Sequence, residues 1–112
     1  MYTRNVSMKL KDNSAPEFTR TLENEVIPVL RKQKGFRDEI TLVAPERTEV
    51  LAISFWDRKE DAEAYSREKY PEILKILSKV VEGAPKVESF DVANSTFHQI
   101  AAKAGICATD CA

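Results

Sequence analysis

The fold is decided by the stretch Val50-Leu51-Ala52-Ile53-Ser54-Phe55-Trp56-Asp57. Side chains alternate between the two faces of a strand, so this stretch predicts a strand with two apolar faces. The two sets are Leu51, Ile53 and Phe55, which we expect to face helices, and Val50, Ala52 and Trp56, which we expect to face away from them. A small sheet usually buries one face against its own helices. We therefore expect a second copy of the protein to cover the other face.

Length and composition indicate a single domain that does not bind nucleic acid. The chain has 112 residues, of which 43% are hydrophobic and 31% charged, and its 17 Lys and Arg nearly balance its 18 Asp and Glu. One domain is usual at this length. Because the charges are balanced and scattered, we expect neither nucleic acid nor a membrane as a partner. No apolar run reaches the roughly 20 residues of a membrane span, and no apolar signal segment opens the chain, so we expect a cytoplasmic protein.

The predicted elements follow the order strand, helix, strand, strand, helix, strand. Strands are expected at residues 2–10, 37–44, 50–57 and 86–93, and helices at residues 14–34 and from 58 to about 82. This β-α-β-β-α-β order is that of the ferredoxin-like α+β fold, an antiparallel sheet with helices on one face. The expected domain covers residues 1–101, followed by a C-terminal tail at residues 102–112. We interpret Cys107 and Cys111 as free thiols of that tail, with a disulfide or a redox pair as alternatives.

Local signals mark the ends of the helices. Ser14 with Glu17 predicts a capping box at the start of the first helix, and a similar signature begins at Asp57 for the second. Pro28 lacks an N–H and predicts a kink in the first helix. Gly35 predicts a left-handed residue that ends it.

Alternation also predicts which side chains of the other strands meet the helices. The residues expected to face the helices are Val6, Met8, Leu10, Ile40 and Leu42. Those expected on the opposite face are Asn5, Ser7, Thr41 and Val43. The last strand lacks a regular period, which a bulge near Ser89 would explain.

Three segments of the sequence fit one family pattern. They are PVLRKQKGF at residues 28–36, FWD at 55–57 leading to DAEAY at 61–65, and VESFDV at 87–92. Together they resemble the antibiotic biosynthesis monooxygenase (ABM) domain of the dimeric α+β barrel superfamily, over roughly residues 2–100. The resemblance implies a homodimer in which two sheets pack face to face and form a dimeric α/β barrel.

The resemblance also implies a reaction. Enzymes of the ABM family oxidise polycyclic aromatic substrates with O2, without metal or flavin. The resemblance therefore implies a monooxygenase that needs no cofactor or metal and acts on a small aromatic or polyketide-like molecule. A non-catalytic small-molecule-binding or structural dimer is the alternative, because one fold serves many functions. A haem-binding or haem-degrading protein is a further alternative.

Cofactor-free oxygenation needs an apolar pocket, a group that removes a phenolic proton, and a water-poor space for oxygen. The catalytic candidates are His98, the only histidine and thus the natural base near neutral pH, and Asn5, which could bond a substrate or a reactive oxygen species. The substrate-binding candidates are Trp56, Tyr65 and Ser54. Structural interpretations are also possible. Trp56 and Tyr65 can be buried core aromatics, the Asn5 amide can bond to the backbone, and His98 can be a surface or interface histidine.

The haem alternative finds less support in the sequence. Haem-degrading relatives use an asparagine on the first strand, a tryptophan on the second helix and a histidine further along that helix as iron ligand. Asn5 matches the first position, but Tyr65 stands at the second and the predicted helix contains no histidine. Without that axial ligand, the sequence favours the oxygenase over a haem site.

Overall fold

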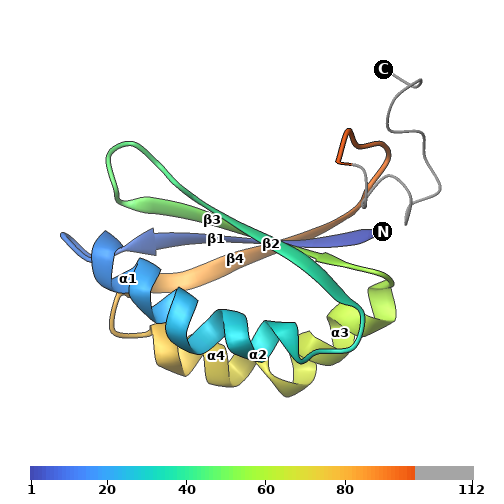
Figure 1. Cartoon of the computed structure of the whole chain (residues 1–112). Coiled ribbons are helices and arrows are strands. Elements are labelled where there is room, and N and C mark those ends of the chain that lie inside the picture. Colours follow the sequence, from blue (N-terminus) through green and yellow to red (C-terminus); the bar gives the residue numbers. More distant parts are fainter. Residues whose placement is uncertain (98–112) are drawn as a thin grey trace.

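The computed structural model of the protein describes residues 1–97. Four antiparallel strands form one sheet in the order β2-β3-β1-β4. The strands are β1 (Tyr2–Leu10), β2 (Phe36–Val43), β3 (Glu49–Trp56) and β4 (Val81–Asp91), and the helical segments are α1 (Ala15–Thr21), η1 (Leu22–Val26), α2 (Ile27–Arg31), α3 (Lys59–Glu68) and α4 (Tyr70–Leu77). The labelled helices lie together on one face of the sheet (Figure 1). The predicted ferredoxin-like α+β fold is confirmed, while the predicted boundary at residue 101 and the tail cysteines lie outside the described residues.

The helical region between β1 and β2 changes its hydrogen-bonding pattern ahead of Pro28. Leu22–Val26 form a π-helical turn between α1 and α2. Proline has no N–H to donate and its ring crowds the preceding turn, and the wider π turn accommodates both effects. The disturbance predicted for Pro28 thus takes the form of a π turn.

The helix ends agree with the sequence, but the capping bonds do not. Gly35 follows α2 with φ +78°, which confirms the predicted left-handed residue. The N-terminal residues Ser14 of α1 and Arg58 of α3 make no side-chain capping bond. The capping box predicted at Ser14 is therefore wrong as a hydrogen-bonding motif, while Asp57 accepts two hydrogen bonds from Arg37.

The prediction for β3 assigned its two faces the wrong way round. Val6 pairs with Ala52 and Met8 pairs with Val50, and directly paired residues of antiparallel strands lie on the same face. Since Val6 and Met8 are buried under the helices as predicted, Val50 and Ala52 face the helices too. The residues wrongly assigned to the helix side are Leu51, Ile53 and Phe55.

The same error applies to β2. Ile40 pairs with Ile53 and Leu42 pairs with Leu51, so both residues of β2 lie on the face away from the helices. The alternating pattern separates two sets but cannot say which set meets the helices when both are apolar. Burial decides here, because the large ring of Trp56 is 0% exposed and belongs to the helix-facing set.

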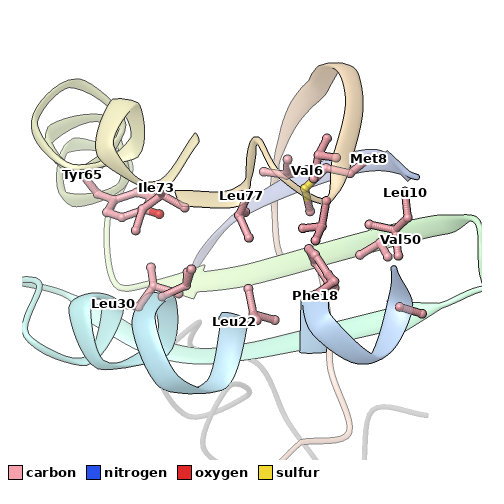
Figure 2. Packing of buried hydrophobic residues seen from close by; sticks show 14 of the residues in the cluster. Val6, Met8, Leu10, Phe18, Leu22, Leu30, Val50, Tyr65, Ile73 and Leu77 are labelled. Carbon is pink, nitrogen blue, oxygen red and sulfur yellow. The ribbon is translucent and has the colours of Figure 1, made fainter. Parts of the chain in front are cut away.

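The hydrophobic core fills the space between the sheet and its helices. Figure 2 shows side chains of β1 and β3 meeting those of α1, η1, α2, α3 and α4. The labelled members are Val6, Met8, Leu10, Phe18, Leu22, Leu30, Val50, Tyr65, Ile73 and Leu77. Within residues 1–97, no helix is both long enough and apolar enough to span a membrane.

Strand β4 is longer and bulged at a different place than predicted. It begins at Val81, and the segment 83–85 that we expected to close the helical region belongs to the strand. The register against β1 shifts between Ser7 and Lys9, where Gly83 has φ +74°. Ser89 is paired regularly, so the bulge predicted there is wrong. A glycine supplies the positive φ that such an irregularity requires.

Candidate functional site

A small cavity lies between the sheet and the helices. Its volume is about 40 Å³, and its walls are aliphatic side chains of β1, β3, η1, α2 and α4. Four polar residues also line it: Arg4 of β1, Glu39 of β2, Ser54 of β3 and Tyr70 of α4. A few polar groups converging in an apolar cavity are typical of a small-molecule site.

The strand register places three of these polar groups in a row. Glu39 pairs with Ser54, and Ser54 pairs with Arg4. All three therefore project from neighbouring strands on the helix-facing side. We call Glu39, Ser54 and Arg4 the polar row. Tyr70 faces the same cavity from the helix layer.

Ser54 is held by two hydrogen bonds. The indole Nε1 of Trp56 donates to Ser54 Oγ at 2.8 Å, and the Ser54 hydroxyl donates to the carbonyl oxygen of Arg4 at 3.3 Å. The ring of Trp56 packs against Tyr65 with 5.2 Å between centroids and against Phe36 with 5.6 Å. Because a buried indole N–H needs an acceptor, Ser54 stabilises Trp56 at the centre of this aromatic cluster.

Arg4 is a charged residue buried beside aromatic rings. Arg4 is only 5% exposed. Its guanidinium carbon lies 3.9 Å from the ring centroid of Tyr70 and 5.5 Å from that of Tyr65. Cation–π attraction of this kind offsets part of the cost of burying the charge. Arg4 forms no ion pair with a carboxylate of residues 1–97.

Burial shifts the ionisation of the groups around Arg4. Loss of hydration raises the pKa of Tyr65 to about 12 and raises the pKa of Tyr70, although the nearby charge of Arg4 opposes both shifts. Burial also raises the pKa of Glu39, against the effect of a hydrogen bond from the Thr41 hydroxyl at 2.6 Å. Glu39 therefore keeps its proton to a higher pH than an exposed glutamate does.

The structure brings together three of the five predicted site residues. Ser54, Trp56 and Tyr65 lie on the helix-facing side, although Trp56 and Tyr65 are core residues and only Ser54 lines the cavity. Asn5 pairs with Ile53 and lies on the opposite face of the sheet, away from the cavity. His98 lies outside the described residues. The predicted binding and catalytic roles stay predictions.

Sequence reasoning missed Arg4, Glu39 and Tyr70 as site residues. The available signal was Arg4 itself, which shares its alternation with Val6 and Met8 and so carries a charge into the apolar face of β1. Glu39 gave no such signal, because the assignment of β2 was inverted. Residues 1–97 hold no group of three or more His, Cys, Asp or Glu side chains that could share a metal ion.

The helix-free face of the sheet is a second surface with unusual composition. We call this surface, which carries Ile40, Leu42, Leu51, Ile53, Phe55 and Phe90, the open face. Leu42 is 50% exposed and Phe90 52% exposed. The Oδ1 atom of Asn5 lies on this face, buried and without a hydrogen-bond partner in the described part of the chain.

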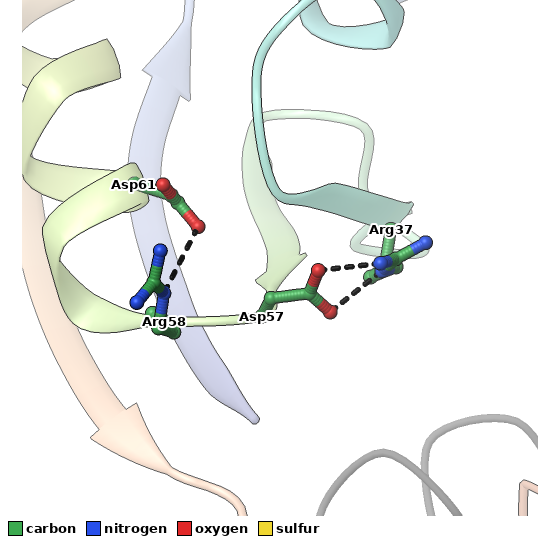
Figure 3. Close-up of polar contacts among 4 residues, drawn as sticks. All are labelled: Arg37, Asp57, Arg58 and Asp61. Atoms are coloured by element: carbon green, nitrogen blue, oxygen red, sulfur yellow. Dashed lines mark hydrogen bonds and ion pairs between the residues drawn. The ribbon is translucent and has the colours of Figure 1, made fainter.

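Charged residues also cluster where β2, β3 and α3 meet. We call Arg37, Asp57, Arg58 and Asp61 the charged corner. Arg37 donates from Nε to Asp57 at 2.6 Å and from a second nitrogen to the same carboxylate, and Arg58 lies 4.0 Å from Asp61 (Figure 3). The bidentate bond raises the pKa of Arg37. The backbone N–H of Asp57 also donates to the carbonyl of Gly35 at 2.8 Å. These contacts fix the chain where it leaves β3 for α3.

Known proteins match this chain in structure but not in sequence. No family model matches the chain, and no curated protein matches it. A monooxygenase from the gene ActVA-Orf6 of Streptomyces coelicolor, solved with nanaomycin D, has a TM-score of 0.72 at 14% identity, with 83% of this chain and 88% of that chain covered. SnoaB, a cofactor-independent oxygenase from Streptomyces nogalater, has a TM-score of 0.68 at 12% identity, with 83% and 93% covered.

A protein of unknown function from Nitrosomonas europaea has a similar score, a TM-score of 0.69 at 11% identity, with 82% of this chain and 88% of that chain covered. The chain therefore has the fold of the antibiotic biosynthesis monooxygenases. At these identities the likeness defines the fold, and the activity must be argued from the site.

Proposed function

We propose that the protein is a cofactor-independent monooxygenase that oxidises a small aromatic or polyketide-like molecule with O2. The observation that carries this proposal is the polar row of Glu39, Ser54 and Arg4 inside an otherwise aliphatic cavity. The fold, shared with two oxygenases, supports the same reaction class. A cavity with mainly apolar walls, one acid and one cation provides what proton removal and anion stabilisation need.

Each member of the polar row has a role in this reaction. With an anthrone-type substrate, the Glu39 carboxylate accepts the proton that leaves the activated CH2 or phenolic group, and Arg4 stabilises the resulting anion. O2 then reacts with the anion: one oxygen atom becomes the new carbonyl oxygen, and the other leaves as water with the two hydrogens of the CH2 group. Because burial raises the pKa of Glu39, its carboxylate is a stronger base than that of an exposed glutamate.

The size of the cavity limits this proposal and favours a second candidate. Ligand pockets usually measure about 300–1,000 Å³, whereas this cavity measures about 40 Å³. Oxygenation of a multi-ring substrate therefore requires α4 to move away from η1 and α2. If the cavity stays closed, the protein is a non-catalytic binder of a smaller molecule or a structural dimer. We do not propose a haem site, because α3 and α4 contain no histidine.

Oxygen uptake tests the reaction. We expect the wild-type protein to consume O2 with anthrone and to form the quinone without added metal or flavin. Glu39→Gln should lower the rate by about 100-fold or more, the usual contribution of a general base. Glu63→Gln on the surface of α3 is the matched control and should leave the rate unchanged. Uptake no faster than in buffer, or full activity of Glu39→Gln, would contradict the proposal.

We also propose that two copies associate through the open face. Three strands contribute apolar side chains to this face, and no helix within residues 1–97 covers it. Contiguous exposed apolar surface usually marks an interface. A second copy would also offer polar partners to the amide oxygen of Asn5. The proposed assembly is the face-to-face dimer of an α/β barrel.

A further inference from the structure

Arg4 can also bind a negative group that the substrate already carries, besides the anion formed in the proposed reaction. We propose that the cavity binds the carboxylate group of a small organic acid, with Arg4 as its anchor. This inference rests on the proposed function, because it takes the same cavity as the substrate site and names the class of substrate. It concerns binding alone and involves no step of the oxidation.

The donors in the cavity suit a carboxylate. A guanidinium presents its N–H groups as a planar fork that matches the two oxygens of a carboxylate. Arg4 is 5% exposed, lines the cavity, and forms no ion pair with a carboxylate of residues 1–97. Two aromatic faces support its charge, but aromatic rings do not accept its N–H groups as an oxyanion does.

Tyr70 provides a second donor for the same group. Its hydroxyl oxygen is buried and has no hydrogen-bond partner among the described residues. The guanidinium carbon of Arg4 lies 3.9 Å from the centroid of the Tyr70 ring. Burial raises the pKa of Tyr70, so its hydroxyl keeps the proton that it would donate. Buried polar groups normally have hydrogen-bond partners, so a buried hydroxyl beside a buried guanidinium that lacks a carboxylate partner suits a carboxylate ligand.

Glu39 sets a condition on this binding. Its carboxylate lies in the same cavity and would repel a second anion if both were charged. Burial raises the pKa of Glu39, which weakens this repulsion relative to that of an exposed glutamate. A neutral residue at position 39 should therefore strengthen anion binding, whereas loss of Arg4 should abolish the preference for an anion.

The cavity is large enough for a carboxylate group but too small for a large ligand. A volume of about 40 Å³ is slightly more than the share of one water molecule in the liquid, about 30 Å³. A carboxylate can enter this space, and an attached apolar body must displace the aliphatic side chains around it. Met8, with its flexible thioether, is the wall residue best suited to such displacement.

Calorimetric titration with benzoate and benzamide tests the inference. The two probes share one shape and differ in charge. We expect the wild-type protein at pH 7 to bind benzoate at least ten-fold more tightly than benzamide. Arg4→Met should bring the two affinities to parity, and Glu39→Gln should increase the preference for benzoate. Arg37→Met is the matched control, because Arg37 lies at the surface, and should keep the wild-type preference.

Equal affinity for the two probes, binding of neither probe, or a preference that survives Arg4→Met would overturn the inference. The comparison of probes on the wild-type protein needs no variant, so a folding defect in Arg4→Met cannot mask the result. The outcome is also separate from the reaction. A benzoate preference without O2 uptake refutes the oxygenase alone, and O2 uptake without a benzoate preference refutes the carboxylate site alone.

Discussion

Substitution of Gly35 by alanine should be strongly destabilising, because two separate costs coincide at this residue. Its φ of +78° lies in the left-handed region, where an L-residue costs about 1–2 kcal/mol. A Cβ atom would also lie 2.1 Å from Oδ2, 2.5 Å from Cγ and 2.7 Å from Cβ of Asp61. Asp61 is itself buried, at 8% exposure, so overpacking adds about 1–3 kcal/mol. The expected loss is about 2–5 kcal/mol.

Gly83 provides a matched control for this experiment. Its φ is +74°, yet a Cβ atom there would meet nothing within 4 Å. Gly83→Ala should therefore carry only the backbone cost of about 1–2 kcal/mol. The difference between the two variants isolates the contact between Gly35 and Asp61.

Urea unfolding measures both variants. Trp56 is the only tryptophan and is fully buried, so its fluorescence reports the loss of the core. With a slope of about 2 kcal/mol per M, the midpoint of Gly35→Ala should fall by about 1–2.5 M at a fixed protein concentration. If Gly35→Ala costs no more than Gly83→Ala, the close approach of Asp61 does not constrain the chain and the reasoning fails.

Three further predictions follow from the faces and charges of the sheet. Val50→Asp should unfold the subunit, because Val50 is 3% exposed in the core and a buried unpaired charge is costly. Ile53→Asp on the open face should keep the fold and yield monomers in sedimentation. Identical behaviour of the two variants would refute the face assignment. Glu39 has a raised pKa in the folded state, so its contribution to stability should fall as pH rises above its ordinary value of 4.5, and Glu39→Gln should remove that decline from pH-dependent unfolding curves. Arg37→Ala should change the urea midpoint little, because solvent screens the exposed Arg37–Asp57 pair; a clear fall of the midpoint would mean that this corner has a greater structural role.

The sequence was sufficient for the order of elements because local signals agree with one another. Alternation in β1, the left-handed glycine after α2 and the proline within the first helical region each had one physical interpretation. These signals involve residues close in the chain. Gly35 is the clearest case, since only a positive φ at that position ends the helix as observed.

The orientation of β2 and β3 was not predictable from alternation, because both faces of β3 are apolar. What selects the orientation is long-range: β3 pairs with β1, and this pairing places Val50 and Ala52 beside the buried Met8 and Val6. The polar row was missed for the same reason, since only the sheet register places Glu39 and Arg4 on the same face, on either side of Ser54. Arg4 alone was visible as a charge in an apolar set.

The irregularity in β4 has a consequence for how copies of the protein meet. β4 is an edge strand of the sheet, and this edge is a border between the sheet and solvent. The free N–H and C=O groups of a flat edge strand can pair with further chains without limit. The shifted register at Gly83 twists this border, and Pro85 removes one donor from it. Polymerisation through this border is thereby discouraged, as the closed pair that we propose requires.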